Sequence, residues 1–390
     1  MMRAARPVAV VLAVVMAALV ALTGPASAIE RNFAGSAQLD YHFVPTSRQA
    51  RAFPNAFDGF TMEFAGKLAV DFSEKVSANM KVCFGCHGFE ADMMYFDIRA
   101  ADELNFRVGR FSPSFGAFNL RHDPANHRTS DKPLPYDMGR MLRMRQWNMS
   151  VLPSPFPDNG VEINGTKALG PSAQLDYAVY GVMGFKSESR PQDIDFKLSR
   201  SPQAYYVDQN ARPTVGGRLA LTINLGEASD LTLGVSAMGG PYDPENRETY
   251  VIFGGDVSLR LDKTNIRMEY LGRRQTFDIS NKAIFKYVLA DERGDFFMKH
   301  GAYAEIEQAL TPELDLIGRV DGMYRVGNVE AASELSRRSS VFRYTLATAY
   351  AIERGLRIKL STELWEFSDR DALTGRKVEL SFHSGLAGSF

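Results

Sequence analysis

The chain has 390 residues, with 45 lysines and arginines against 46 aspartates and glutamates, so its formal net charge is -1. This balance argues against a nucleic-acid partner. Two cysteines are too few for a disulfide scaffold. Beyond the first residues no apolar run reaches the roughly 18 residues of a membrane helix, so the rest is either soluble or a barrel.

Residues 1–28 have the features of a cleaved export signal. Arg3 and Arg6 precede a continuous apolar run that closes with the small residues Ala26-Ser27-Ala28. The alternative is a membrane anchor, which the shortness of the run and the cleavage-type ending disfavour. We therefore expect the mature chain to begin near Ile29, in an oxidising compartment.

The mature chain alternates apolar and polar residues in runs of about ten, as strands between lipid and water do. In the run 33–43 one face reads Phe, Gly, Ala, Leu, Tyr, Phe, and the run 60–72 repeats this pattern. Charged residues recur on the opposite face of strand after strand, which favours a barrel over a soluble β-sandwich. The full set of runs is 33–43, 60–72, 76–84, 92–100, 104–111, 160–167, 173–185, 215–225, 230–239, 250–261, 264–273, 296–307, 313–324, 341–350, 355–366 and 377–390.

These runs predict an all-β fold, a transmembrane antiparallel barrel of about sixteen strands with a water-filled lumen. Short polar turns such as 73–75 and 226–229 alternate with long segments, which places the short turns in the periplasm and the long loops outside. We expect one domain over residues 29–390, with a long third extracellular loop at about 117–158.

The last strand ends in Phe390, and an alternating strand with a C-terminal aromatic residue is typical of bacterial outer-membrane proteins. We therefore expect Phe390 to be recognised by the barrel-assembly machinery. The predicted location is the bacterial outer membrane, with lipid around the barrel.

The only two cysteines, Cys83 and Cys86, stand in a Cys-x-x-Cys-His motif with His87, which is the attachment signature of c-type haem. The strand pattern places this motif at a hairpin tip on the extracellular rim. In that case His87 is the proximal iron ligand, and His122, His127 or a methionine of the long loop is the sixth ligand. Two alternatives stay open: a small Cys83–Cys86 disulfide, or a zinc or iron site completed by His122 or His127.

Several segments resemble the phosphate-selective porin family, of the porin O and P type. They are NFRVGRFSPSFG (105–116), DNGVEINGTKALGPSAQLDYAVYGVMGF (158–185), PTVGGRLALTINL (213–225), NIRMEYLGRR (265–274) and GAYAEIEQALTPELDLIGRVDGMYRV (301–326). The resemblance lies in the residue patterns of the strands over most of the mature chain, without a single diagnostic motif. It implies a sixteen-stranded porin, usually a homotrimer, whose long third loop folds into the pore. Phosphate selectivity does not carry over, because the inward face mixes both signs of charge.

The long loop carries more basic than acidic residues. If it folds inward, these residues form a positive pore constriction that concentrates anions. As a solvated surface loop, its charges would only keep it soluble. The basic residues are Arg121, Arg128, Lys132, Arg140, Arg143 and Arg145.

The leading functional prediction is an outer-membrane channel for small solutes, anions among them, that carries a covalent haem if the motif is loaded. One alternative is a haem-bearing electron-transfer barrel, and another is a structural barrel with a plugged lumen. No catalytic constellation stands out, so no enzymatic activity is predicted.

Overall fold

The computed structural model describes residues 30–45, 59–85, 88–137, 150–187, 196–200, 204–278, 287–289, 296–327, 329–331, 340–367 and 377–390. The predicted export signal at residues 1–28 lies outside these ranges. Among the described residues, no helix has the length and apolar character needed to cross a membrane.

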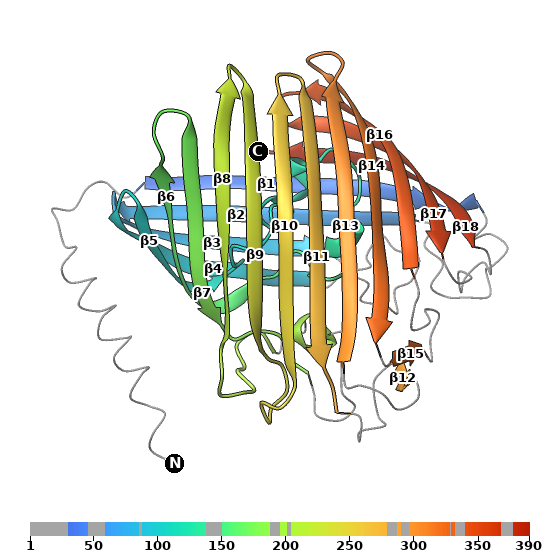
Figure 1. Cartoon of the computed structure of the whole chain (residues 1–390). Coiled ribbons are helices and arrows are strands. Elements are labelled where there is room, and N and C mark those ends of the chain that lie inside the picture. Colours follow the sequence, from blue (N-terminus) through green and yellow to red (C-terminus); the bar gives the residue numbers. More distant parts are fainter. Residues whose placement is uncertain are drawn as a thin grey trace.

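Sixteen antiparallel strands form a closed barrel in which each strand pairs with its neighbours in the chain and β1 pairs with β18. The strands of one wall cross those of the other in Figure 1. The strands are β1 (Glu30–Phe43), β2 (Gly59–Ser73), β3 (Val76–Gly85), β4 (Gly88–Ala101), β5 (Leu104–Phe111), β6 (Asp158–Ala168), β7 (Ala173–Val182), β8 (Thr214–Gly226), β9 (Ser229–Pro241), β10 (Thr249–Leu261), β11 (Thr264–Thr276), β13 (Phe296–Ala309), β14 (Leu314–Gly327), β16 (Ser340–Glu353), β17 (Leu356–Phe367) and β18 (Val378–Ser389).

All sixteen predicted runs correspond to barrel strands, and the fold class is confirmed. The reason is visible in β18, where exposed and buried residues alternate strictly from Val378 to Ala387. Large apolar side chains on the outward face are exposed, as Phe60, Leu219 and Leu346 are. A closed barrel pairs every backbone group internally and presents this apolar face to lipid, which places the chain in the bacterial outer membrane.

The connections differ between the two ends of the barrel. Short turns join β2 to β3, β4 to β5 and β8 to β9, and the barrel starts and ends at this same rim, which is the periplasmic one. One feature was not predicted: the long segments after β11 and β14 contribute β12 (Tyr287–Leu289) and β15 (Val329–Ala331), which pair as a separate two-stranded sheet.

The seam between the first and last strands depends on a glycine. Gly35 N donates to Phe390 O at 2.9 Å and Phe390 N donates to Gly35 O at 3.1 Å, so the C-terminal residue closes the ladder. The Phe390 ring lies against Phe33, with 5.6 Å between the ring centroids. A Cβ on Gly35 would lie 2.8 Å from the backbone oxygen of Ala65 and would also meet the Phe390 ring.

We therefore expect Gly35→Ala to destabilise the barrel by about 1–3 kcal/mol, because the clash with Ala65 is with backbone and cannot be relieved by a rotamer change. The measurement is urea unfolding in lipid vesicles, together with the heat-dependent gel shift of the folded barrel. Gly66 pairs with Gly35 across β1 and β2, and a Cβ there would meet its nearest neighbour at 3.5 Å. Gly66→Ala is thus the matched control, and equal losses in both variants would contradict the explanation.

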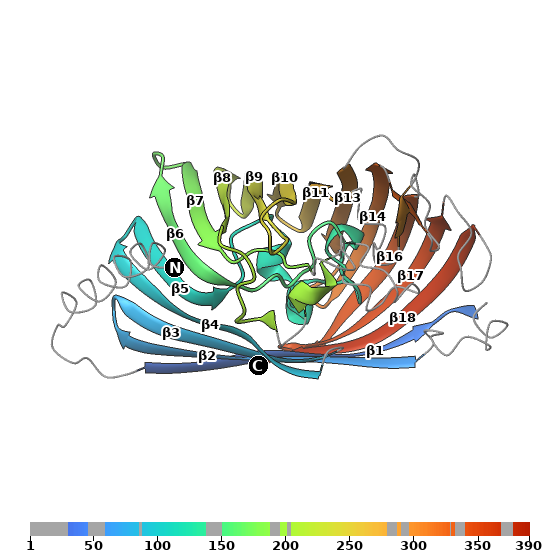
Figure 2. The same cartoon turned by 90° about the horizontal axis from the view of Figure 1, so that it is seen from below.

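The lumen is not empty. The segment between β5 and β6 turns back into the barrel and forms the short helices η2 (Asn119–Arg121), η3 (Pro124–Asn126) and η4 (Leu134–Tyr136). Figure 2 shows this teal segment between the two walls. We call residues 112–137 together with 150–157 the inward loop. A further short helix, η5 (Lys197–Arg200), lies in the long connection after β7.

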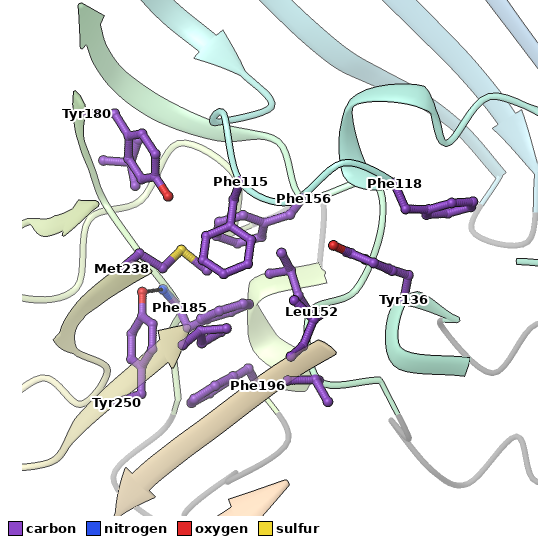
Figure 3. Packing of buried hydrophobic residues seen from close by; sticks show 14 of the residues in the cluster. Phe115, Phe118, Tyr136, Leu152, Phe156, Tyr180, Phe185, Phe196, Met238 and Tyr250 are labelled. Atoms are coloured by element: carbon purple, nitrogen blue, oxygen red, sulfur yellow. Dashed lines mark hydrogen bonds between the residues drawn. The ribbon is translucent and has the colours of Figure 1, made fainter. Parts of the chain in front are cut away.

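The inward loop builds an apolar core against β5, β7, β9, β10, β11 and β13. Its loop members, such as Phe115, Leu152 and Phe156, contact wall residues such as Met238 and Tyr250 (Figure 3). Aromatic rings in this cluster pack in tilted, edge-on and stacked arrangements, and all its members are buried. One side of the lumen is therefore filled by side chains, and the space that remains lies mainly along β2–β5.

Candidate functional site

Glu269 on β11 fixes the start of the inward loop. Its carboxylate accepts the backbone N–H groups of Ala117 at 3.0 Å and Phe118 at 3.2 Å, and the hydroxyl of Tyr136 also donates to it. On the other wall, the Ser114 N–H donates to Glu162 at 2.8 Å. Two buried wall carboxylates thus hold the backbone donors that a loop would otherwise leave without partners inside the barrel.

A buried ionic cluster fastens the middle of the inward loop to β14 and β16. Asp131 accepts from Arg319 at 2.7 Å and also pairs with Arg343. Arg343 donates to Asp321 at 2.9 Å and to the backbone oxygen of Lys132 at 2.7 Å. These charges are removed from solvent, so each depends on its partners to offset the cost of desolvation.

A buried lysine makes a second attachment. Lys359 on β17 donates to the backbone oxygens of Pro124 at 2.7 Å and Thr129 at 3.3 Å, and to the side chain of Gln38 at 2.8 Å. One ammonium therefore joins β17, β1 and the loop around η3.

The basic loop residues of the predicted constriction lie inside the barrel but are engaged by the wall. Arg128 donates to Asp315 at 2.9 Å, Arg121 donates to the Tyr303 hydroxyl at 3.4 Å, and Lys132 lies 3.9 Å from Glu63. In the described part of the loop these three cations are matched in number by its three carboxylates, those of Asp123, Asp131 and Asp137. The predicted constriction residues Arg140, Arg143 and Arg145 lie outside the described residues.

His122 belongs to a cluster centred on Lys81 of β3. The Lys81 ammonium lies 3.0 Å from Asp92 Oδ2, 2.8 Å from Asp123 Oδ1 and 2.8 Å from His122 Nε2. Cys83 joins the same cluster through its thiol, which donates to Asp92 at 3.4 Å. An ammonium thus occupies the space between four side chains of metal-ligating type, and a metal ion there would have to displace it.

The structure describes one residue of the predicted haem motif. Cys83 is a free thiol on the inward face of β3, and Gly85 pairs with Gly88 across the hairpin. Cys86 and His87 lie outside the described residues. The candidate sixth ligand His122 shares a cluster with Cys83, but both of its ring nitrogens are engaged, Nδ1 by the Asn119 backbone oxygen at 2.7 Å and Nε2 by Lys81.

The other candidate ligand, His127, lies beside the buried Lys359 attachment. Its Nδ1 donates to the Thr129 backbone oxygen at 2.9 Å, and its ring packs against Phe118. Burial lowers the pKa of His127 well below the ordinary range, with the Lys359 ammonium acting in the same direction. The ring is therefore neutral, and it serves the packing of the loop.

One further group has the residue types of a metal site: Asp131, Glu363 and His383 place one ligand atom each within 4.8 Å of one another. Arg343 contacts both carboxylates, lying 3.5 Å from Glu363 and pairing with Asp131. The guanidinium already supplies the positive charge, so the arrangement is that of an ionic attachment for the loop.

Two cavities lie along the wall formed by β1–β6. The first cavity has a volume of about 380 Å³ and lies between that wall and the inward loop, with Lys67, Arg107, Leu120 and Asp123 in its lining. The second cavity, of about 250 Å³, lies nearer the periplasmic turns and is lined by Asp97, Arg99 and Arg107 among others. Arg107 lines both cavities.

Sequence patterns placed Lys81, Glu269, Arg319, Arg343 and Glu363 on the inward face of the strands, which is correct. They gave no sign that Lys81, Glu269, Arg319 and Arg343 contact the loop, because their loop partners are 41 to 211 residues away in the chain. The only hint of these loop contacts in the sequence was the high density of charged residues on the inward face of the strands.

The loop histidines predict a pH dependence. Burial and the neighbouring Lys81 ammonium lower the pKa of His122 to about 4. In the unfolded chain the His122 ring is protonated as the pH falls below about 6.5, whereas in the folded protein it stays neutral until about pH 4. The free energy of unfolding therefore falls as the pH falls through this window. Asp123, whose pKa lies well below its usual range, adds its loss only under more acidic conditions.

We expect wild type to lose about 3 kcal/mol more than His122→Gln between pH 7 and pH 4, because glutamine does not titrate. Urea unfolding in vesicles at both pH values measures the difference. An equal loss in the two proteins would show that His122 is not the group responsible.

A closed sixteen-stranded antiparallel barrel with an apolar exterior and a loop folded into its lumen is the architecture of the porins, so the protein is an outer-membrane barrel of the porin type. No family model matches the chain, and no curated protein matches it.

Solved structures of outer-membrane channels share the fold. The anion-selective porin from Comamonas acidovorans is 9% identical, with a TM-score of 0.56 over 93% of this chain and 100% of that one. The channel DcaP of Acinetobacter baumannii is 11% identical, with a TM-score of 0.54 over 95% and 100%. Salmonella typhi OmpF, in complex with daunomycin, is 6% identical, with a TM-score of 0.54 over 92% and 97%. At these identities the likeness concerns the fold alone, and the resemblance to phosphate-selective porins stays a prediction.

Proposed function

We propose that the protein is a passive channel for small hydrophilic solutes. The observation that carries this proposal is the pair of cavities inside the barrel that share Arg107 in their lining and lie mainly along β2–β5. In this proposal solutes pass along the face of β2–β5 that the cavities occupy, and the buried attachments at Asp131 and Lys359 hold the inward loop in place beside it.

Planar-bilayer recording of the purified barrel in KCl tests the channel. Stepwise conductance increases are expected, and a KCl gradient then gives the ion preference from the reversal potential. We expect this reversal potential to indicate a preference for anions. A barrel that inserts, as judged by its heat-dependent gel shift, but never conducts would leave the plugged structural barrel as the explanation.

Covalent haem at Cys83, Cys86 and His87 stays a prediction that rests on the sequence motif alone. Production in a host with c-type haem maturation should yield a haem-stained band in a denaturing gel and a visible absorption spectrum. A colourless protein would exclude haem. In that case, thiols that react with a label directly would indicate two free cysteines, and thiols that react only after reduction would indicate a disulfide. Assembly as a homotrimer and recognition of Phe390 by the assembly machinery also stay predictions.

A further inference from the structure

Arg274 lies on the outer face of the barrel, close to the extracellular end of β11. Its cross-strand neighbours, Val251 on β10 and Met298 on β13, belong to the outward face, whereas the adjacent Arg273 is buried on the inward face. The strand ends at Thr276, so Arg274 lies where the hydrocarbon layer gives way to the lipid headgroups. A lipid-facing arginine costs little at this depth, because its side chain reaches the headgroup region.

In the part of the chain that the structure describes, no carboxylate pairs with Arg274. Its guanidinium lies over the Phe296 ring, 5.5 Å from the ring centroid, a contact that neutralises no charge. Another polar side chain on this face, His300 on β13, already has a partner, because its Nδ1 is hydrogen-bonded to the Tyr270 hydroxyl at 2.7 Å. Arg274 therefore presents a positive charge that is available to an anionic lipid headgroup.

A groove of about 560 Å³ lies on the same outer face, across β11, β13, β14, β16 and β17. These strands are neighbours in one wall of the barrel (Figure 1). The floor of the groove is low at Gly318, which has no side chain, and at Ala304. The exposed side chains of Met268, Tyr344 and Leu346 project around this floor. The surface of the groove is almost wholly apolar, so it suits a hydrocarbon chain.

The distance between Arg274 and the groove matches the depth of one leaflet. Met268 and Arg274 lie six residues apart on β11, which at about 3.3 Å per residue is about 20 Å along the strand. Barrel strands tilt by about 40°, so the corresponding depth is about 15 Å, half of a hydrocarbon core about 30 Å thick. A lipid with its headgroup at Arg274 therefore has acyl chains that end at the groove.

An acidic residue lies at the other edge of this wall. Glu366 is exposed near the extracellular end of β17, four strands from Arg274. With about 4.8 Å between neighbouring strands, the two residues are roughly 19 Å apart across the wall. This separation exceeds the Debye length of about 8–10 Å, so Glu366 has little effect on an anion held at Arg274.

We infer that this face binds an anionic phospholipid of the outer leaflet, with the phosphate at Arg274 and one acyl chain in the groove. Arginine forms paired hydrogen bonds with phosphate oxygens, which strengthens the headgroup contact. A chain in the groove packs against its floor and its sides, whereas a chain on a smooth part of the wall packs on one side only. The inference goes beyond the channel function, because it concerns the lipid-facing surface and not the lumen.

Native mass spectrometry of the purified barrel in detergent measures lipid binding directly. Dimyristoylphosphatidylglycerol is the probe. Dimyristoylphosphatidylcholine has the same chains without a net charge, and dihexanoylphosphatidylglycerol has the same headgroup with chains too short to reach the groove. We expect the probe to bind at lower concentration than both comparison lipids. Arg274→Gln should raise the apparent Kd of the probe roughly three- to tenfold and leave that of the phosphatidylcholine unchanged.

Gly318→Leu tests the groove, because the new side chain occupies its floor. A Cβ at Gly318 would lie 3.5 Å from Ile306, which is ordinary contact, so the barrel should still fold. This variant should raise the apparent Kd of the probe by a similar factor. Gly66→Leu is the matched control, because Gly66 lies on β2, outside the groove, and a Cβ there also meets its nearest neighbour at 3.5 Å. The heat-dependent gel shift shows whether each variant is folded.

Arg212→Gln is the control for the charge, because Arg212 is exposed in the connection before β8 and not on this wall. It should bind the probe as wild type does, and so should Glu366→Gln. Equal binding of the phosphatidylglycerol and the phosphatidylcholine, unchanged binding in Arg274→Gln, or equal effects of Gly318→Leu and Gly66→Leu would overturn the lipid site. Loss of a dimer or trimer mass in Gly318→Leu, without any dependence on lipid charge, would overturn it too and assign the groove to a second copy of the chain.

Discussion

Replacing Arg343 with methionine is expected to release the inward loop from β16. The change leaves Asp131 and Asp321 buried with Arg319 as a cationic partner that they share, and it leaves Glu363 with His383, so at least one carboxylate loses its compensation. Removing one partner of a buried ionic cluster typically costs about 3–5 kcal/mol. The variant should unfold at lower urea concentration, and its single-channel conductance should be larger and noisier, because the loop is held less firmly in the lumen.

The control for this variant is Arg260→Met, which removes an arginine from an exposed pair with Asp230. Exposed pairs contribute about 0–1 kcal/mol, so this control should unfold and conduct as wild type does. If Arg343→Met kept both the wild-type urea midpoint and the wild-type conductance, the ionic cluster would not be what holds the loop.

Truncating a side chain of the aromatic cluster should lower the free energy of unfolding about as much as Arg343→Met does. Phe185 is buried, and its ring centroid lies 4.4 Å from that of Phe196, 4.6 Å from that of Phe156 and 5.0 Å from that of Tyr250. Phe185→Ala removes these contacts and leaves a cavity that the surrounding rings cannot close, for which about 3–5 kcal/mol is typical. Urea unfolding in vesicles measures the loss.

Phe60→Ala serves as the comparison, because Phe60 is 73% exposed on the outer wall. Its removal gives up lipid contact without creating an enclosed cavity, so the loss should be clearly smaller. Equal losses at the two positions would mean that the cluster inside the lumen does not contribute as a packed core.

The two variants probe different sides of the same loop. The aromatic cluster attaches it to β7–β11 through shape and burial, whereas Arg319, Arg343 and Lys359 attach it to β14–β17 through charge and hydrogen bonds. The loop is also paired with β2 and β3 through Asp123 and with β6 through Ser114, and both cavities lie beside these contacts, mainly along β2–β5.

The sequence alone determined the barrel. In a membrane-spanning strand one face contacts lipid and the other faces the lumen, and side chains alternate between them with a period of two. Each strand can therefore be recognised from its own residues. This is why the sixteen runs could be read one at a time, from Phe33 to the strand that ends at Phe390, and why the inward position of Arg319 or Glu363 followed directly.

Only the tertiary structure decided how the lumen is filled. The basic excess of the long loop predicted a positive constriction, but whether Arg128 faces a solute or Asp315 depends on a contact across 187 residues. Equally, no local pattern shows that Leu120 would stand exposed beside Lys67, or that Phe185 would stack on Phe196. Loop residues carry no periodicity, and their partners lie on distant strands, so their roles are set by the closed barrel into which the loop folds.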